Sequence, residues 1–223
     1  MLKRFGIVLI LSFISVLSFT TSASALVNYG NVSGWMASTS VSKIGFFSAS
    51  DIKLYITKNS NWLMTDTNFS TYITHAIDSW HSVVNKTTST GTSSNFVKSF
   101  NGIGRSDANS LSIPSNVLGL NTWTASTYYG YGKAYGTHNF DVYTIQKSVT
   151  YLIWSTSGAG KTSDFTANQW KNVFAHEYGH GLGYYGHSAN STKDLMWEDT
   201  SSYSDWGTIS PTQYDKGHMG IVY

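Results

Sequence analysis

The sequence contains no cysteine, and this absence excludes disulfide bonds as a source of stability. The fold must therefore depend on core packing, on a bound metal ion, or on both. Only 12% of the residues are charged, and no basic helix or cluster of Lys and Arg is present, which argues against a nucleic-acid partner. Proline is rare, with 2 residues in the chain, and no Pro-rich linker divides it, so we expect one domain and a monomer.

The chain has one long apolar run, Phe5 to Phe19, which follows Lys3 and Arg4 and precedes a stretch of small residues ending at Ala25. This order is typical of a secretory signal peptide, and a run of about 15 residues is shorter than the roughly 20 that a membrane-spanning helix needs. An uncleaved anchor is the alternative. We predict cleavage after Ala25 and a secreted, extracellular protein without stable membrane association, whose single domain is residues 26–223.

Hydrophobic spacing predicts the secondary structure of the remaining chain. Residues 26–50 have no period and are interpreted as an N-terminal arm, and residues 51–57 alternate like a strand. Apolar residues recur at helical spacing over 68–85, which predicts an amphipathic helix. The polar residues 86–110 favour a loop with a short strand near 96–100. Further strands are expected at 117–124, 143–146 and 149–155, with a surface hairpin loop at 128–136.

Two helices are predicted in the C-terminal part. The first begins at Thr166, which forms a capping box with Gln169, and ends at the glycines 181 and 183. The second is expected to begin with Ser210 as its cap and Pro211 as its first residue.

The first of these helices carries the pattern His-Glu-x-x-His at residues 176–180. Residues four apart lie on the same face of a helix, so His176 and His180 can ligate one zinc ion. Glu177 is placed to act as base for a water molecule that zinc activates. A zinc site of this kind needs a third protein ligand, and His187, Asp194 and Glu198 are the candidates.

Residues 176–183, His-Glu-Tyr-Gly-His-Gly-Leu-Gly, resemble the first eight positions of the metzincin signature, most closely its matrixin branch. The resemblance implies that the chain turns at Gly183 to bring a third histidine to the zinc ion. The signature places that histidine at position 186, which here is Gly186, so His187 follows after a one-residue insertion. The resemblance also implies a methionine turn beneath the zinc ion, and Met196 matches it. It covers roughly residues 166–220.

Matrixins are often kept latent by a cysteine of a pro-segment that binds the zinc ion, and the absence of cysteine excludes that switch here. Many relatives bind structural Ca²⁺ or a second Zn²⁺. His138 and Asp141 match such a site only weakly, and a surface pair without metal is the simpler interpretation. His75 and His81 lie on the first predicted helix and are not expected to be ligands.

We therefore expect an α+β fold of the zincin type, with a twisted mixed sheet, two long helices and a last C-terminal helix. The expected function is that of a zinc endopeptidase acting on proteins or peptides, with His176, His180 and His187 as zinc ligands and Glu177 as general base. Residues 149–155 are a candidate edge strand for binding an extended substrate. A zinc hydrolase acting on cell-wall material and an inactive, zinc-stabilised binding protein are the alternatives.

Overall fold

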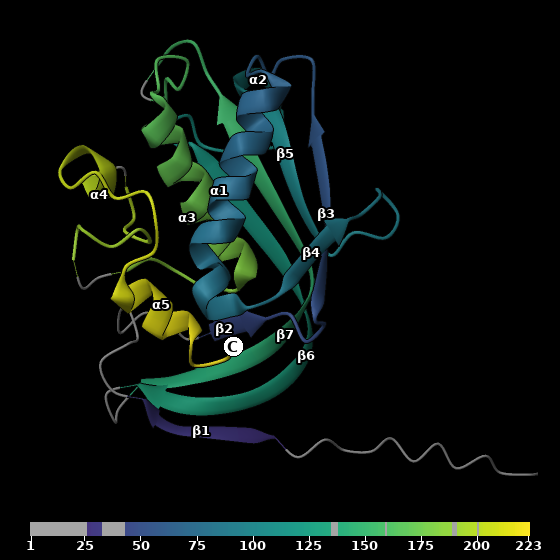
Figure 1. Cartoon of the computed structure of the whole chain (residues 1–223), viewed down its shortest axis with the longest axis vertical. Coiled ribbons are helices and arrows are strands. Elements are labelled where there is room, and N and C mark those ends of the chain that lie inside the picture. The colour runs from purple at the N-terminus through teal and green to yellow at the C-terminus, as the bar shows by residue number, and fades with distance from the viewer. Residues whose placement is uncertain (1–25, 33–42, 135–137, 159, 189–190, 200) are drawn as a thin grey trace, which may run out of the picture.

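The computed structural model of the chain describes residues 26–32, 43–134, 138–158, 160–188, 191–199 and 201–223. The predicted signal peptide, residues 1–25, lies outside the described residues. The described part combines helices with one mixed β-sheet, which agrees with the expected α+β class (Figure 1). None of the helices in these ranges is long and apolar enough to cross a membrane.

The described strands form one sheet in the order β1-β6-β7-β5-β3-β4, and β2 pairs with β7 beside this path. Strand β6 runs antiparallel to β7, whereas every other pairing in the sheet is parallel. The strands span Val27–Val32 (β1), Lys43–Phe46 (β2), Asp51–Lys58 (β3), Thr87–Thr90 (β4), Lys98–Gly104 (β5), Gly119–Ala134 (β6) and His138–Trp154 (β7).

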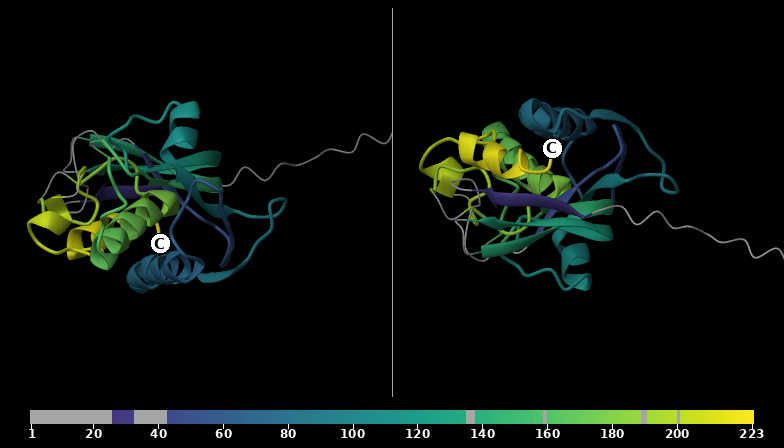
Figure 2. Two further views of the ribbon diagram at one scale, coloured as in Figure 1. Left: turned by 90° about the horizontal axis from the view of Figure 1, so that it is seen from above. Right: turned by 90° about the horizontal axis from the view of Figure 1, so that it is seen from below.

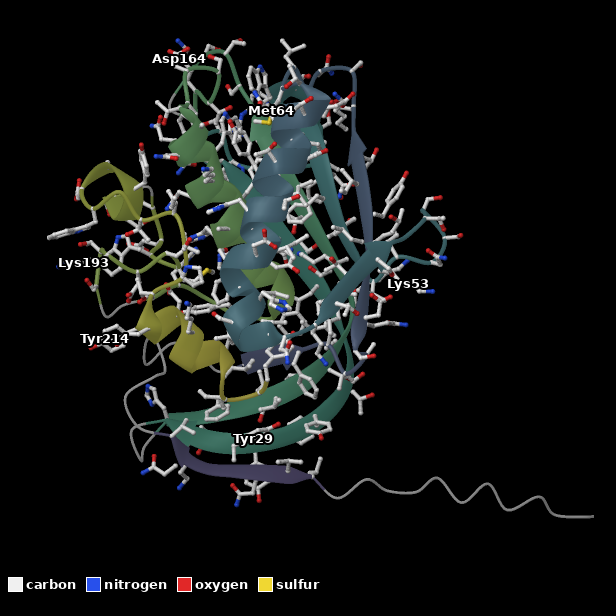
Figure 3. All side chains as sticks on the ribbon, viewed as in Figure 1. Tyr29, Lys53, Met64, Asp164, Lys193 and Tyr214 are labelled. Carbon is white, nitrogen blue, oxygen red and sulfur yellow. The ribbon has the colours of Figure 1, made fainter. Side chains whose placement is uncertain are left out.

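Two long helices, α1 and α3, lie side by side on one face of the sheet, and the short α2 lies on the opposite face (Figures 1 and 2). The short helices α4 and α5 follow α3, and α5 packs against α1. Buried apolar side chains of the long helices and the sheet form one core cluster. The side chains of the described residues are drawn on the ribbon in Figure 3. The helices span Asp66–Val84 (α1), Arg105–Ser110 (α2), Ala167–Leu182 (α3), Ser201–Ser204 (α4) and Gln213–Met219 (α5).

Local signals explain where α1 begins and ends. The side chain of Thr65 accepts a hydrogen bond from the backbone N–H of Asn68, which satisfies one of the free donors of the first turn. Asn85 ends the helix in the left-handed conformation at φ 35°. The apolar face that the sequence predicts is buried, and Trp80 is fully enclosed. Its Nε1 donates to the carbonyl of Ala175 at 2.9 Å, so α1 holds α3 directly before His176.

Aromatic side chains form the core between the helices and the sheet. The ring of Phe174 on α3 lies 5.6 Å from that of Phe69 and 5.5 Å from that of Tyr72, both on α1. On its other side, Phe174 stacks on Phe100 of β5 at 6.2 Å. Burial of these large rings is the main stabilising term for the position of α3.

Two predictions about the connecting segments were wrong. The expected N-terminal arm contains β1 and β2, whose pairing partners lie about a hundred residues away and leave no local period. The expected loop at 128–136 is part of β6 up to Ala134. The glycines of this segment suggested a loop, but they serve packing within the sheet. A Cβ at Gly130 would clash with the carbonyl of Val27, and a Cβ at Gly132 would clash with the ring of Phe140, so each glycine lets a neighbouring group approach the strand closely.

Two further predictions are corrected. Thr212, not Ser210, caps the last helix, because Thr212 and Asp215 form the capping box and α5 begins at Gln213. Residues 149–155 are not an edge strand, since 149–154 belong to β7, which lies between β5 and β6. Among the described residues, the part of β6 before Gly130 pairs with β7 alone. The free edge near these residues therefore belongs to this part of β6 and not to β7.

Candidate metal centre

Helix α3 places two histidines one above the other. The predicted capping box is present, because Gln169 N–H donates to Thr166 Oγ1 at 3.3 Å and Thr166 N–H donates to Gln169 Oε1 at 2.8 Å. The helix continues without interruption to Leu182. His176 and His180 therefore share a face, and their Nε2 atoms lie 3.0 Å apart.

The turn after α3 returns the chain to this face. Gly183 ends the helix at φ +118°, and a Cβ there would clash with the backbone of Gly45 on β2. The carbonyl of Gly183 accepts the N–H of Gly45 at 3.0 Å, which ties the turn to the sheet. Gly186 also has a positive φ of 77°. Two residues in the left-handed region reverse the chain, and only glycine adopts that region without strain.

The third histidine reaches the first two through this turn. Ring centroids of His187 and His180 lie 4.9 Å apart, and those of His187 and His176 lie 5.3 Å apart. One ring nitrogen from each of the three histidines lies within 4.8 Å of the others. The group can hold one metal ion. The extra residue in the turn is absorbed between Gly183 and Gly186.

Backbone carbonyls select the tautomer of the two helical histidines. Nδ1 of His176 lies 2.7 Å from the carbonyl oxygen of Leu195, and Nδ1 of His180 lies 2.8 Å from that of Tyr184. A carbonyl only accepts, so each Nδ1 carries the proton and each Nε2 keeps a lone pair. Two lone pairs facing each other at 3.0 Å repel unless a cation lies between them.

The surroundings of the histidines favour their neutral form. Burial and the charge of His187 together lower the pKa of His176 to about 4, although the hydrogen bond to Leu195 opposes the shift. Burial and the charges of the other two histidines place the pKa of His180 well below its ordinary value. Burial also lowers the pKa of His187, and Glu198 opposes that shift. Neutral imidazole is the form that binds a metal ion.

Met196 lies against the helix between the two histidine positions. Its side chain is fully buried, and a Cβ at Gly179 would lie 2.6 Å from its sulfur atom. The buried carboxylate of Asp215 on α5 accepts the N–H of Leu195 at 2.9 Å and that of Met196 at 3.3 Å. Helix α5 thereby positions the methionine and also the Leu195 carbonyl that orients His176.

The two acidic alternatives for a third ligand are placed differently. Asp194 accepts hydrogen bonds from the hydroxyls of Ser188 and Thr212 and is not part of the histidine group. Glu198 lines the same cleft as the histidines, but it does not belong to their group. Of the three candidates, the structure brings His187 to the pair.

Glu177 lies in a narrow buried space beside His176. Its exposed fraction is 7%, and a Cβ at Gly119 of β6 would lie 2.5–2.7 Å from its Cγ, Cδ and Oε1. Among the described residues, its Oε2 has no hydrogen-bond partner. Burial raises the pKa of Glu177, and the charge of Lys98 opposes the rise. No hydrogen bond within the described residues therefore occupies Oε2.

The sequence analysis missed Lys98, which is fully buried under α3. Its Nζ donates to Thr150 Oγ1 at 3.1 Å and to Ser148 Oγ at 3.4 Å. Burial lowers the pKa of Lys98, and the charge of Glu177 opposes that shift. The sequence contained one indication that Lys98 is buried. Lys98 lies two residues before Phe100, and residues two apart on a strand face the same side, so Lys98 shares the side of the strand that carries this apolar residue.

A cleft of about 990 Å³ runs beside the histidines. One wall is formed by residue 118 and the free edge of β6 over residues 119–123, and the other is the face of α3 that carries Asn172, Val173, His176, Glu177 and His180. The turn residues Tyr184–His187 and the acidic residues Glu198 and Asp199 close its end. The exposed Tyr185 contacts Trp123 edge to face at 6.2 Å, so aromatic rings form part of its rim.

The remaining histidines do not join this group. His75 Nε2 lies 2.7 Å from the carbonyl of Ile209, and His81 is exposed in the last turn of α1. His138 and Asp141 both lie on β7, but within the described ranges the three histidines 176, 180 and 187 form the one group of potential metal ligands.

In comparisons with known proteins, no family model matches the sequence, and no curated protein matches it significantly. The geometry of the site is therefore the basis for assigning a function.

Proposed function

We propose that this protein is a secreted zinc-dependent endopeptidase of the metzincin type, similar to the matrixins. His176, His180 and His187 would hold the zinc ion, and Glu177 acts as general base and then as general acid. The observation that carries the proposal is the convergence of three imidazoles beside a buried carboxylate in a large cleft. Such a cleft with few convergent polar groups is typical of a catalytic site.

The donor set fits zinc. Three histidine nitrogens without a fourth protein ligand are typical of catalytic zinc sites, in which the open position takes water or substrate. Two nitrogens at 2.0–2.1 Å from a tetrahedral ion lie about 3.3 Å apart, and the Nε2 atoms of His176 and His180 are 3.0 Å apart. When bound, zinc would polarise a substrate carbonyl and lower the pKa of a water molecule to about 7.

Glu177 supplies the proton transfers. It lines the cleft next to His176, and its Oε2 is without a partner in the described part of the chain. The Glu177 carboxylate accepts a proton from the attacking water and donates it to the leaving amine. Burial makes the carboxylate a stronger base, because desolvation raises its pKa.

The free edge of β6 supports a peptide as substrate. Residues 118–123 line the cleft, and β6 pairs there with β7 on its other side alone within the described residues. An extended peptide can add to such an edge as a further strand and place one carbonyl near the histidines. The edge provides backbone hydrogen bonds independent of the peptide's side chains.

Secretion is part of the proposal and rests on the pattern of residues 1–25. Casein and peptidoglycan distinguish a protease from a cell-wall hydrolase. We expect the purified protein, residues 26–223, to cleave casein, a chelator to stop the cleavage, and zinc to restore it. Cleavage of peptidoglycan alone would support the cell-wall hydrolase instead.

The variant Glu177→Gln tests the mechanism. It removes the base but keeps the size of the side chain, so hydrolysis should be lost while zinc stays bound. The matched control is Asp78→Asn on the exposed face of α1, which should retain activity. Hydrolysis by Glu177→Gln would refute the role of Glu177, and a wild type that binds zinc but hydrolyses neither substrate would support a binding protein.

A further inference from the structure

Lys98 is a buried cation whose position no packing requirement explains. It begins β5, and its ammonium group lies 5.0 Å from the ring centroids of Phe100 and Tyr178. Neither ion pair found in the described ranges includes it. Burial of an ammonium group without an ionic partner is unfavourable, and a methionine would fill the same space without that cost. A functional role accounts for the retention of the charge.

Hydroxyl and amide groups orient the ammonium group. Ser148 and Thr150 of β7 accept its hydrogen bonds, and Asn121 Nδ2 of β6 donates to the same hydroxyls, at 3.0 Å to Ser148 and 2.6 Å to Thr150. Each hydroxyl oxygen has two lone pairs, so it can accept from Asn121 and from Lys98 together. An ammonium group has three N–H donors, so the arrangement suits the charged form and leaves a further donor in this layer.

Two glycines bring Lys98 and Glu177 into the same layer. A Cβ at Gly181, one turn after Glu177 on α3, would clash with the Lys98 ammonium group. Gly119, two residues before Asn121 on β6, makes room for the Glu177 carboxylate. The charge of Glu177 opposes the lowering of the pKa of Lys98, and Oε2 of Glu177 is an acceptor without a partner among the described residues.

We propose that Lys98 is a positioning residue for the hydrolytic reaction, whose ammonium charge holds the Glu177 carboxylate in its orientation from inside the protein. This inference rests on the proposed function of Glu177. Lys98 acts through Glu177 and touches neither substrate nor metal. Water screens the attraction less than at the surface, because both groups are buried.

A double-mutant cycle tests the pairing without any need for hydrolysis. Thermal unfolding is measured for the metal-loaded wild type, Lys98→Met, Glu177→Gln and the double variant. Coupled charges make the shift in unfolding midpoint of the double variant smaller than the sum of the two single shifts. Additive shifts would overturn the proposal, whether or not the protein is a protease. Lys147→Met is the control, since Lys147 is exposed and lies over Phe96. Its shift in unfolding midpoint should add to that of Glu177→Gln.

Kinetics on casein distinguish positioning from structural support. We expect Lys98→Met to lower kcat at least about tenfold, with KM within about twofold and metal content unchanged, because an interaction made in the transition state is lost. The residual activity of Glu177→Gln should not fall further when Lys98→Met is added. An unchanged kcat in Lys98→Met would overturn the proposal.

Gly181→Ala is the second variant, for the case that Lys98→Met does not fold. The added methyl group displaces the ammonium group and keeps its charge in the protein. It should lower kcat as Lys98→Met does, with equal metal content. A Gly181→Ala protein with wild-type kcat would also overturn the proposal.

Discussion

The backbone N–H of Ser188 donates to the carbonyl oxygen of Met196 at 2.7 Å. This bond joins the residue after the third histidine to the turn that contains the buried methionine. The adjacent carbonyl of Leu195 orients His176, and Asp215 on α5 holds the N–H groups of both Leu195 and Met196. The C-terminal helix thus supports the histidine group through backbone contacts.

The first prediction concerns His187. We expect His187→Ala to lower zinc affinity more than about 100-fold, because loss of a residue that only orients a ligand costs about 10–100-fold and His187 would be a ligand itself. Competition with a chromogenic chelator measures the affinity. His81→Ala, an exposed histidine on α1, is the control and should bind zinc as the wild type does. Undiminished affinity in His187→Ala would remove His187 from the site.

The second prediction concerns the space beside the proposed base. In Gly119→Ala the new methyl group would meet the Glu177 carboxylate at 2.5–2.7 Å, so the carboxylate must move. Displacement of a reacting group by about 1 Å can cost about 100-fold in rate, and we expect kcat to fall by that order with zinc content unchanged. Gly220→Ala is the control, since its φ of −63° accepts alanine. Equal activity of both variants would contradict the prediction.

The third prediction concerns the support from α5. Asp215→Asn replaces a buried acceptor of the N–H groups of Leu195, Met196 and Thr212 by an amide that has one acceptor atom. We expect the free energy of unfolding to fall by about 2–4 kcal/mol, the usual cost of disrupting a buried hydrogen-bond network of this size. Urea denaturation measures it. The exposed Asp205→Asn should stay within about 0.5 kcal/mol of the wild type, and an equally small effect of Asp215→Asn would show that these bonds contribute little.

The fourth prediction concerns acid stability. His218 on α5 is fully buried, stacks on Tyr184 at 4.0 Å, and has no hydrogen-bond partner for either ring nitrogen in the described part of the chain. Burial lowers the pKa of His218 to about 3, whereas unfolded histidine titrates near 6.5. Above pH 6.5 its contribution to stability is fully present. Below pH 6.5 the unfolded state binds a proton that the folded state does not bind. The free energy of unfolding therefore falls with pH until the pH reaches the pKa of His218 in the folded state.

The variant His218→Phe isolates this effect, because phenylalanine keeps an aromatic ring on Tyr184 and does not titrate. The free energy of unfolding of the wild type should fall more steeply than that of the variant below pH 6.5, by about 1.4 kcal/mol per pH unit. Urea denaturation from neutral pH to about pH 4 measures both slopes. Parallel pH profiles would contradict the assignment to His218.

Local patterns predicted both long helices well, and long-range pairings limited the rest. The helix predicted at 68–85 and the helix beginning after Thr166 agree with α1 and α3, because caps and helical periodicity act within a few residues. The segments predicted as 143–146 and 149–155 form one strand, β7, whose extent depends on pairing with β2, β5 and β6. Strand β1 was missed for the same reason, as was β4, which lies with α2 in the segment 86–110 that was predicted as a loop with one short strand.

The sequence by itself determined that His176, Glu177 and His180 share one turn of a helix, because spacing alone sets which residues lie together on a helix. Only the tertiary structure decided that His187 reaches them, since the path from Gly183 to His187 depends on contacts with β2 and with the segment around Met196. Tertiary structure also decided that Lys98 lies in the layer of Glu177. That proximity comes from packing α3 on three strands, and no spacing along the chain contains it.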